Sequence, residues 1–182
     1  RNEHGEAQRL VGLQADIHAD KERDEALLFE AFHDHLTGLP NRALFLDRLS
    51  GELANGLPLV VGFLDLTQFS AVNEKLGTRG ADQVLAEVGV RVAGVLPPEG
   101  FLARHGSDEF ALLLPKLSAE ECEALAGLIR SRLQAPFAHQ GKQVSLDCRL
   151  GFAFAEAGER EPEALIQRAS QAAIEETHEP DS

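Results

Sequence analysis

Three acidic side chains of this sequence stand where a cation and a phosphate group could be held. Asp65 lies near the end of the apolar run 57–66, which predicts a buried central strand. A carboxylate at that position is costly unless it is paired or bound to a metal ion. Because ligands of α/β sheets gather at the ends of core strands, Asp65 is a candidate functional residue.

Asp108 and Glu109 follow a turn of small and polar residues between two apolar runs, and this pattern predicts a β-hairpin. A carboxylate on a hairpin tip can hold a cation, and small neighbours let the backbone come close to a ligand. The hairpin therefore suits a metal–phosphate site. Taken by itself, the pattern is more typical of an ordinary hairpin whose acidic pair is solvated.

The elements that must position these acids follow from the apolar periodicity and the capping residues. Helices are expected over 20–36, 40–55, 68–76, 81–96, 118–133 and 162–176, and strands over 57–66, 101–114 (the hairpin), near 137 and over 144–154. The expected fold class is α+β, with a central, mostly antiparallel sheet of about five strands flanked by helices.

The first part of the chain predicts a connecting segment. Residues 10–17 alternate and predict a strand, which would be the tail of an upstream domain. The helix expected over 20–36 has Asp20 as its cap and an apolar face that includes Leu27 and Leu28. Such a helix could pair with its twin in a homodimer or pack on its own domain.

Composition excludes several classes of function. The chain has 182 residues, 43% hydrophobic content and a net charge of −13, so a nucleic-acid groove or an anionic membrane surface is not expected as its main partner. Cys122 and Cys148 lie in apolar patterns and predict buried free thiols in a reducing, cytoplasmic compartment. The sequence begins at Arg1, so we expect a piece of a longer protein, whose parent could be membrane-anchored.

With these features placed, the chain resembles the GGDEF family, the diguanylate cyclase domains of bacterial signalling. The resemblance covers about residues 34–176. Its motifs are Asp34 with 36–42 (D-x-LTGLPNR), 65–69 (D-x-D-x-F), Asn73 and Asp82 at the family spacing, and 104–110 (R-x-GGDEF).

The resemblance implies a palm-like, ferredoxin-type fold and chemistry on two GTP molecules, which give cyclic di-GMP. Magnesium would bridge the phosphates and neutralise their charge. The implied metal ligands are Asp65, the backbone carbonyl of Leu66 and Asp108. The implied catalytic acids are Asp108 and Glu109, and the implied substrate-binding residues are Asn73 and Asp82 for guanine, and Phe69, Gly106 and Ser107 beside the nucleotide.

The resemblance also implies a domain order. Residues 1–33 are expected to be the tail of a PAS-like sensor domain and a signalling helix, residues 34–178 the GGDEF domain, and residues 179–182 the start of a linker to a possible EAL phosphodiesterase domain.

The sequence departs from the family at several positions. Ser107 replaces the second glycine of the hairpin, and a positive φ there would cost roughly 1–2 kcal/mol. Thr67 replaces the second Asp of the strand end, while Ser70 and Thr177 replace lysines that face phosphates. The product-inhibition motif would fall on 97–100, which lacks it.

Three functions therefore remain open, and whether the chain is an enzyme is left undecided. The first is a degenerate, regulatory GGDEF domain that binds GTP and magnesium weakly or not at all. The second is an active diguanylate cyclase. The third is a nucleotide-independent dimerisation scaffold.

Overall fold

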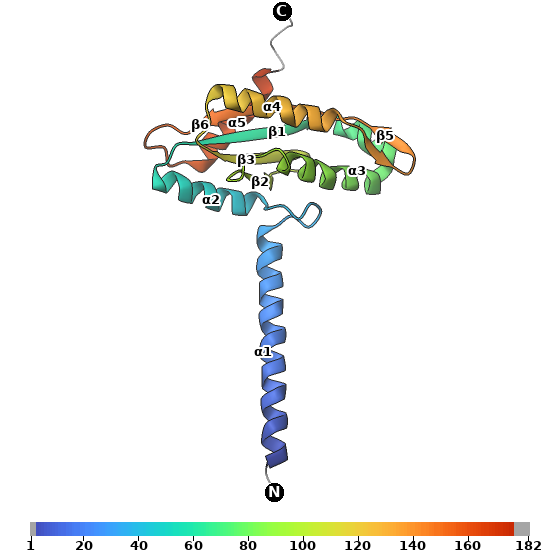
Figure 1. The fold of residues 1–182 in the computed structure, drawn as a ribbon, viewed down its shortest axis with the longest axis vertical. Coiled ribbons are helices and arrows are strands. Elements are labelled where there is room, and N and C mark those ends of the chain that lie inside the picture. The colour runs from blue at the N-terminus through green and yellow to red at the C-terminus, as the bar shows by residue number, and fades with distance from the viewer. Residues whose placement is uncertain (1–2, 177–182) are drawn as a thin grey trace, which may run out of the picture.

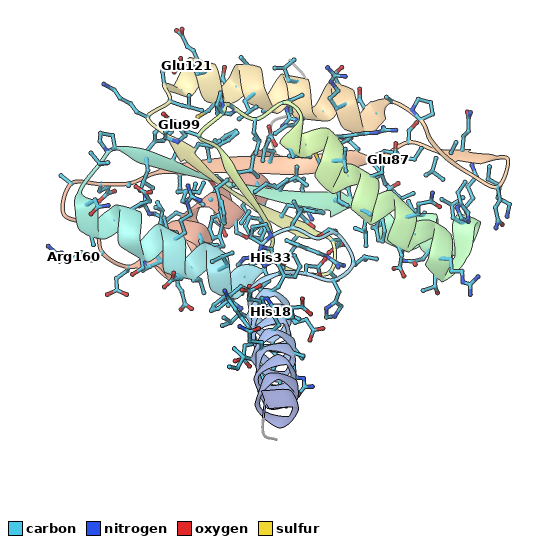
Figure 2. All side chains as sticks on the ribbon, turned by 60° about the horizontal axis from the view of Figure 1, so that its bottom comes forward. His18, His33, Glu87, Glu99, Glu121 and Arg160 are labelled. Carbon is cyan, nitrogen blue, oxygen red and sulfur yellow. The ribbon has the colours of Figure 1, made fainter. Side chains whose placement is uncertain are left out.

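The structure, a computed structural model, describes residues 3–176, and side chains from residue 14 onward. A long helix, α1 (Glu3–Phe32), extends away from a globular body that holds all other elements (Figure 1). From residue 14 to Phe32 the side chains of α1 are exposed and project into solvent (Figure 2). Across residues 3–176 no helix has an apolar stretch long enough to cross a bilayer.

The strand predicted at 10–17 is wrong, because α1 runs through it without a break. Good helix formers fill this segment, and a helix satisfies its own backbone hydrogen bonds whereas a lone strand has no partner. Asp20 therefore lies inside the helix and does not cap it. The helix ends at Phe32, short of the predicted residue 36, because Asp34 accepts hydrogen bonds from Thr37 in a tight loop.

The main sheet is antiparallel, as predicted, and has four strands, where about five were predicted, in the order β2-β3-β1-β6. Its strands are β1 (Leu59–Thr67), β2 (Phe101–Arg104), β3 (Glu109–Pro115) and β6 (Asp147–Phe154). A separate two-stranded ribbon is formed by β4 (Phe137–His139) and β5 (Lys142–Val144). The order places β1 at the centre, so its end carries Asp65 between two neighbouring strands.

Four helices cover the sheet, and local sequence explains most of their ends. They are α2 (Arg42–Asn55), α3 (Phe69–Ala93), α4 (Ala119–Gln134) and α5 (Pro162–Glu175). The Asn41 side chain accepts a hydrogen bond from the Leu44 backbone and caps α2, and the predicted capping box opens α4. The two helices predicted over 68–96 are joined as α3, which kinks at Gly77, where φ is 72°.

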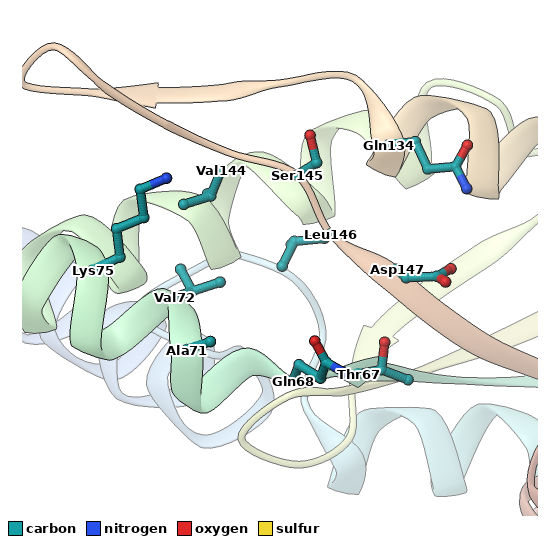
Figure 3. A pocket seen from close by; sticks show the side chains of 10 residues that line it. All are labelled: Thr67, Gln68, Ala71, Val72, Lys75, Gln134, Val144, Ser145, Leu146 and Asp147. Atoms are coloured by element: carbon teal, nitrogen blue, oxygen red, sulfur yellow. The ribbon is translucent and has the colours of Figure 1, made fainter.

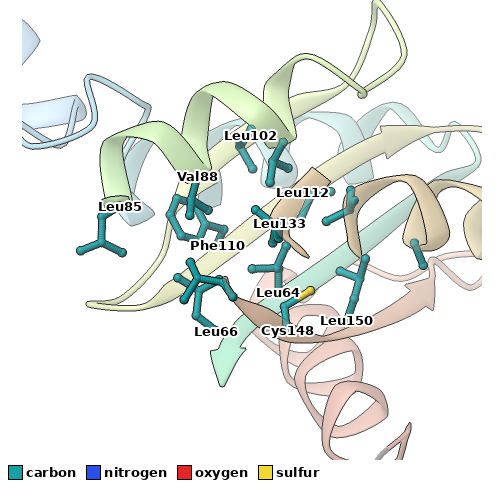
Figure 4. Close-up of a cluster of buried hydrophobic side chains, with 14 of the residues drawn as sticks. Leu64, Leu66, Leu85, Val88, Leu102, Phe110, Leu112, Leu133, Cys148 and Leu150 are labelled. Atoms are coloured by element: carbon teal, nitrogen blue, oxygen red, sulfur yellow. The ribbon is translucent and has the colours of Figure 1, made fainter. Parts of the chain in front are cut away.

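The core has two layers, one on each face of the sheet. Helices α3 and α4 pack on the face that carries Leu64, Leu66 and Phe110 (Figure 4). Helices α2 and α5 pack on the opposite face, which carries Val61 and Phe63. Because side chains alternate along a strand, Asp65 lies on the α2/α5 face.

Both cysteines are buried and free, as predicted. Burial is the main cause that raises the pKa of Cys148 to about 12. The thiol is therefore protonated at neutral pH and behaves as a small core side chain.

The contact between α5 and β6 leaves no room for a side chain at Gly151. A Cβ built there would lie 2.7 Å from the carbonyl carbon of Ala172, and closer still to backbone atoms of Ala169 and Ala173. Since the obstacle is backbone, it cannot rotate aside.

We expect Gly151→Ala to lower the free energy of unfolding by about 1–3 kcal/mol, because the helix must lift from the strand. Urea denaturation measures this change. Gly127→Ala is the matched control, since Gly127 is exposed on α4 and no atom lies within 4 Å of a Cβ built there. A Gly151→Ala chain as stable as wild type would contradict the packing.

Candidate functional site

Three charged side chains form a row across the sheet. In the strand register Asp65 on β1 lies directly opposite Glu109 on β3 and opposite Arg149 on β6. Residues directly opposite in an antiparallel pair point to the same face. The row therefore lies on the α2/α5 face. The Asp65 carboxylate is in the middle, between the Glu109 carboxylate and the Arg149 guanidinium.

Asp65 and Arg149 form an ion pair. Nη2 of Arg149 donates to Oδ2 of Asp65 at 2.5 Å. The Arg149 side chain is 33% exposed and the Asp65 side chain 23%. The Nε atom of Arg149 is buried and has no hydrogen-bond partner in the part of the chain that the structure describes. No local sequence pattern marks Arg149, because only the register of β1 with β6 shows that it faces Asp65.

The site concentrates negative charge at Glu109. Burial, followed by repulsion from Asp65 and Asp108, raises the pKa of Glu109 above its ordinary value, and the charge of Arg42 acts in the opposite direction. These effects require the three carboxylates to be close together. The structure thus brings Asp65 together with the acidic pair of the hairpin, which the sequence had placed in a separate segment.

Asp108 is joined to the end of β1 through the backbone. The Leu66 N–H donates to the Asp108 carbonyl at 3.0 Å. The Ser107 hydroxyl donates to Oδ1 of Asp108 at 3.2 Å. The carboxylate next to the predicted metal position is therefore held partly by Ser107.

The backbone strain considered for Ser107 is not present. Among the non-glycine residues that the structure describes, Gln68 and Gln140 are those with positive φ. The turn therefore accepts serine without the left-handed conformation that would favour glycine. Gly106 is more restricted, because a Cβ there would lie 3.2 Å from the side-chain carboxyl carbon of Glu109 and closer still to one of its oxygens.

An ion pair anchors the hairpin to the loop that precedes α2. Nη1 of Arg104 donates to both carboxylate oxygens of Asp34, at 3.0 and 3.1 Å. Nη2 of Arg104 donates to the Ser107 carbonyl at 2.8 Å, and the Arg104 N–H donates to the Pro40 carbonyl at 2.9 Å. The hairpin tip is thus fixed against the loop by side-chain and backbone bonds together.

Two clefts of about 380 Å³ adjoin the hairpin and share Arg42 and His105. One is lined also by Gly106 and Ser107, and the other by Glu109 and residues of α5. A third cleft, of about 390 Å³, lies between α3, the end of α4 and the segment between β5 and β6 (Figure 3). None of the residues that line this third cleft was predicted to bind a ligand.

The residues predicted to contact the nucleotide base lie on α3. Asn73 is exposed and Asp82 is half-buried, on opposite sides of the kink at Gly77. Phe69 is 9% exposed and belongs to the core cluster between the sheet and α3. Thr177, the position of a phosphate-facing lysine in the family, lies outside the described residues.

The acids fit a magnesium ion in donor type but not in number. Magnesium prefers oxygen ligands and is often held by one or two carboxylates together with substrate phosphates. Within residues 3–176 no group of three or more His, Cys, Asp or Glu side chains is arranged to hold a metal ion by itself. A cation at Asp65 and Asp108 would need further oxygen ligands, and it would meet Arg149 at Asp65.

Comparison with known proteins agrees with this geometry. The family described as "Diguanylate cyclase, GGDEF domain" matches residues 31–181. Diguanylate cyclase DgcP of Pseudomonas aeruginosa is 35% identical over 170 residues, which are 91% of this chain and 25% of that protein. Cyclic di-GMP phosphodiesterase PdeR of Escherichia coli is 33% identical over 165 residues, 90% of this chain and 25% of that protein. The chain thus spans about a quarter of the length of these curated relatives.

A solved structure extends the similarity to the long helix. The coiled coil and GGDEF domain of DgcB from Caulobacter crescentus, in complex with c-di-GMP, superposes with a TM-score of 0.83 at 26% identity. The match covers 94% of this chain and 93% of that one.

The anchoring ion pair has a measurable pH dependence. Burial acts to raise the pKa of Asp34, but the hydrogen bonds from Thr37 and the charge of Arg104 outweigh it, so the pKa lies below its ordinary value. We expect Asp34→Asn to lower the free energy of unfolding at pH 7 by about 1.5–3 kcal/mol. The difference from wild type should be fully present above the ordinary aspartate pKa and should vanish as pH falls through the lower folded-state pKa.

Urea denaturation at a series of pH values measures this difference. Asp47→Asn, an exposed aspartate on α2, is the control and should change stability little at any pH. If Asp34→Asn were as stable as wild type at pH 7, the pair would not anchor the hairpin.

Proposed function

Because this chain belongs to the GGDEF family of diguanylate cyclase domains, we propose that it is a cyclic di-GMP signalling domain with a degenerate, regulatory site. It binds GTP with magnesium weakly, makes little or no cyclic di-GMP, and passes a signal to neighbouring domains. One observation carries this proposal. The three carboxylates suited to a nucleotide–metal site lie close together at the end of β1, while Arg149 forms an ion pair with one of them, Asp65.

The proposed roles follow the geometry of the row. Asp65, the Leu66 carbonyl and Asp108 hold the magnesium ion, which, when bound, offsets the phosphate charge. Glu109 and Asp108 are the proposed catalytic acids. Glu109 lies against Gly106 in the hairpin, and its raised pKa brings it closer to the range useful for proton transfer.

The nucleotide itself would be held by neighbouring elements. Asn73 and Asp82 suit guanine, because an amide and a carboxylate can match its donor and acceptor edge. Gly106 and Ser107 line the cleft beside the hairpin, which suits a phosphate or ribose, and Phe69 supports the start of α3 from the core.

Weak activity follows from the missing positive charge. Ser70 stands on α3 without the charge of a lysine. Thr67, at the end of β1, offers no carboxylate to a cation. Arg104, which lines the cleft beside the hairpin, is likewise engaged by an acid of the protein, Asp34. Each charge-assisted contact missing from the triphosphate removes about 1.5–3 kcal/mol of binding.

An active diguanylate cyclase is the second candidate, and the backbone at Ser107 favours it. Since Ser107 has no left-handed conformation, its side chain is the remaining obstacle at this position. Under this alternative Ser107→Gly raises the rate of cyclic di-GMP formation.

We propose the same domain order that the sequence suggested: residues 1–33 as the end of a PAS-like sensor and its signalling helix, 34–178 as the GGDEF domain, and 179–182 as the start of a linker toward an EAL domain. The short span of this chain along DgcP and PdeR supports flanking domains.

Because its proposed ligands are cytoplasmic nucleotides and its thiols are free, we propose a cytoplasmic location.

Helix α1 is the proposed homodimer contact. Ile17 and Leu28 are 60% exposed, and their separation is close to a whole number of helical turns, so they share one face. Such exposed apolar positions on a free helix suit a coiled coil. The likeness to the coiled coil and GGDEF domain of DgcB supports this proposal.

The nucleotide site is tested by calorimetric titration with GTP and magnesium. Wild type should bind weakly, and Asp65→Ala should lose the signal, because it removes a metal ligand. Chromatography of the same mixtures should detect little or no cyclic di-GMP. Identical heats for both proteins would contradict the proposed nucleotide site. Abundant cyclic di-GMP from wild type would favour the active diguanylate cyclase instead.

The dimer is tested by sedimentation of the full chain. Leu28→Glu should weaken dimerisation by at least about tenfold, because it places charges in the helix contact. Ala26→Glu is the matched control, since Ala26 lies on the opposite face of α1 from Ile17. Equal dimerisation of the two variants would place the contact elsewhere.

A further inference from the structure

Arg149 stands where the proposed metal site would need an unoccupied carboxylate. Its guanidinium is 2.5 Å from Asp65, the carboxylate that would hold the cation. An arginine and a divalent cation seek the same oxygens of a carboxylate. The two therefore cannot both make their best contacts with Asp65 on this side.

The position of Arg149 is set by the sheet and not by a mobile loop. It lies directly opposite Asp65 in the β1–β6 register, so the ladder fixes the distance between the two backbones. Two residues further along β6, Gly151 lies against the backbone of α5, which restrains the strand. The guanidinium is thus presented to Asp65 by rigid elements on both sides.

Repulsion among the carboxylates around Asp65 favours the ion pair between Asp65 and Arg149. Asp108 and Glu109 lie close to Asp65, and three carboxylates without a cation repel one another. Arg149 is the arginine that the structure pairs with Asp65. It supplies, from within the chain, part of the charge compensation that a bound metal would supply.

We propose that Arg149 is a tethered cation that occupies the metal-binding carboxylate of this domain, so that a divalent cation must displace its guanidinium from Asp65 in order to bind. The inference rests on the proposed function, because the competition exists only if Asp65 is a metal ligand. It names a cause of weak magnesium and GTP binding that lies outside the family motifs. The domain then keeps its acids balanced and its site folded when no nucleotide is present.

The test uses Mn²⁺ as the probe, because its free ion is counted directly by electron paramagnetic resonance without any enzyme activity. Removing the guanidinium in R149S should tighten Mn²⁺ binding by about tenfold, the effect expected for freeing one charge-assisted contact. The double variant D65N/R149S should lose this gain. R168S is the matched control and should bind as wild type does, since Arg168 pairs with Glu159 away from the row.

The outcomes separate this inference from the proposed function. If wild type and R149S bind Mn²⁺ equally and D65N/R149S does not bind, the metal site stands and the competition is overturned. If no variant binds Mn²⁺, both the metal site and the competition are overturned. If R149S binds GTP more weakly than wild type, Arg149 is a phosphate ligand and the proposal is likewise overturned.

A measurement on wild type keeps the proposal testable even if R149S folds poorly. Titration with Mg²⁺ should move the side-chain Nε–H signal of Arg149 in a ¹⁵N spectrum, because the guanidinium leaves Asp65. A signal that stays fixed while the Asp65 carboxylate responds to the same Mg²⁺ would overturn the competition.

Discussion

The position of the hairpin tip depends on the ion pair between Asp34 and Arg104. Asp34 belongs to the loop between α1 and α2, and Arg104 is the last residue of β2, so the pair joins segments far apart in the sequence. Both side chains are more than three-quarters buried, which protects the pair from screening by solvent. Arg104 also holds the carbonyl of Ser107, so the hairpin tip, the loop and the start of α2 form one unit. Helix α1 ends directly before this same loop, so α1 is connected to the hairpin through the ion pair.

The row Glu109–Asp65–Arg149 shows how one sheet can hold two neighbouring carboxylates and an arginine on the same face. Two neighbouring carboxylates on adjacent strands repel each other, and the structure offsets this repulsion with an arginine from the third strand. A site that compensates its own charge does not require a metal ion to fold. This is the physical reason for reading the domain as regulatory, while the unstrained backbone at Ser107 keeps the cyclase alternative open.

Local sequence predicted those features that depend on neighbours along the chain. The capping box at Ser118 and the turn between the hairpin strands were visible as short patterns, and the structure confirms them. The failed strand at 10–17 shows the limit of the same reasoning. Alternating apolar residues indicate a strand only where a sheet can receive it, and helical propensity decided the outcome there.

The sequence by itself determined the family, the α+β fold and the identity of the candidate acids, because motifs and periodicity are properties of residue order. Only the tertiary structure decided that Asp65 faces Glu109 on one side and Arg149 on the other. That decision depends on the register of three strands far apart in the chain, and a shift of one residue would turn Arg149 to the opposite face. The charge balance of the site, and with it the competition between a metal ion and an arginine, is therefore a property of the fold and not of any motif.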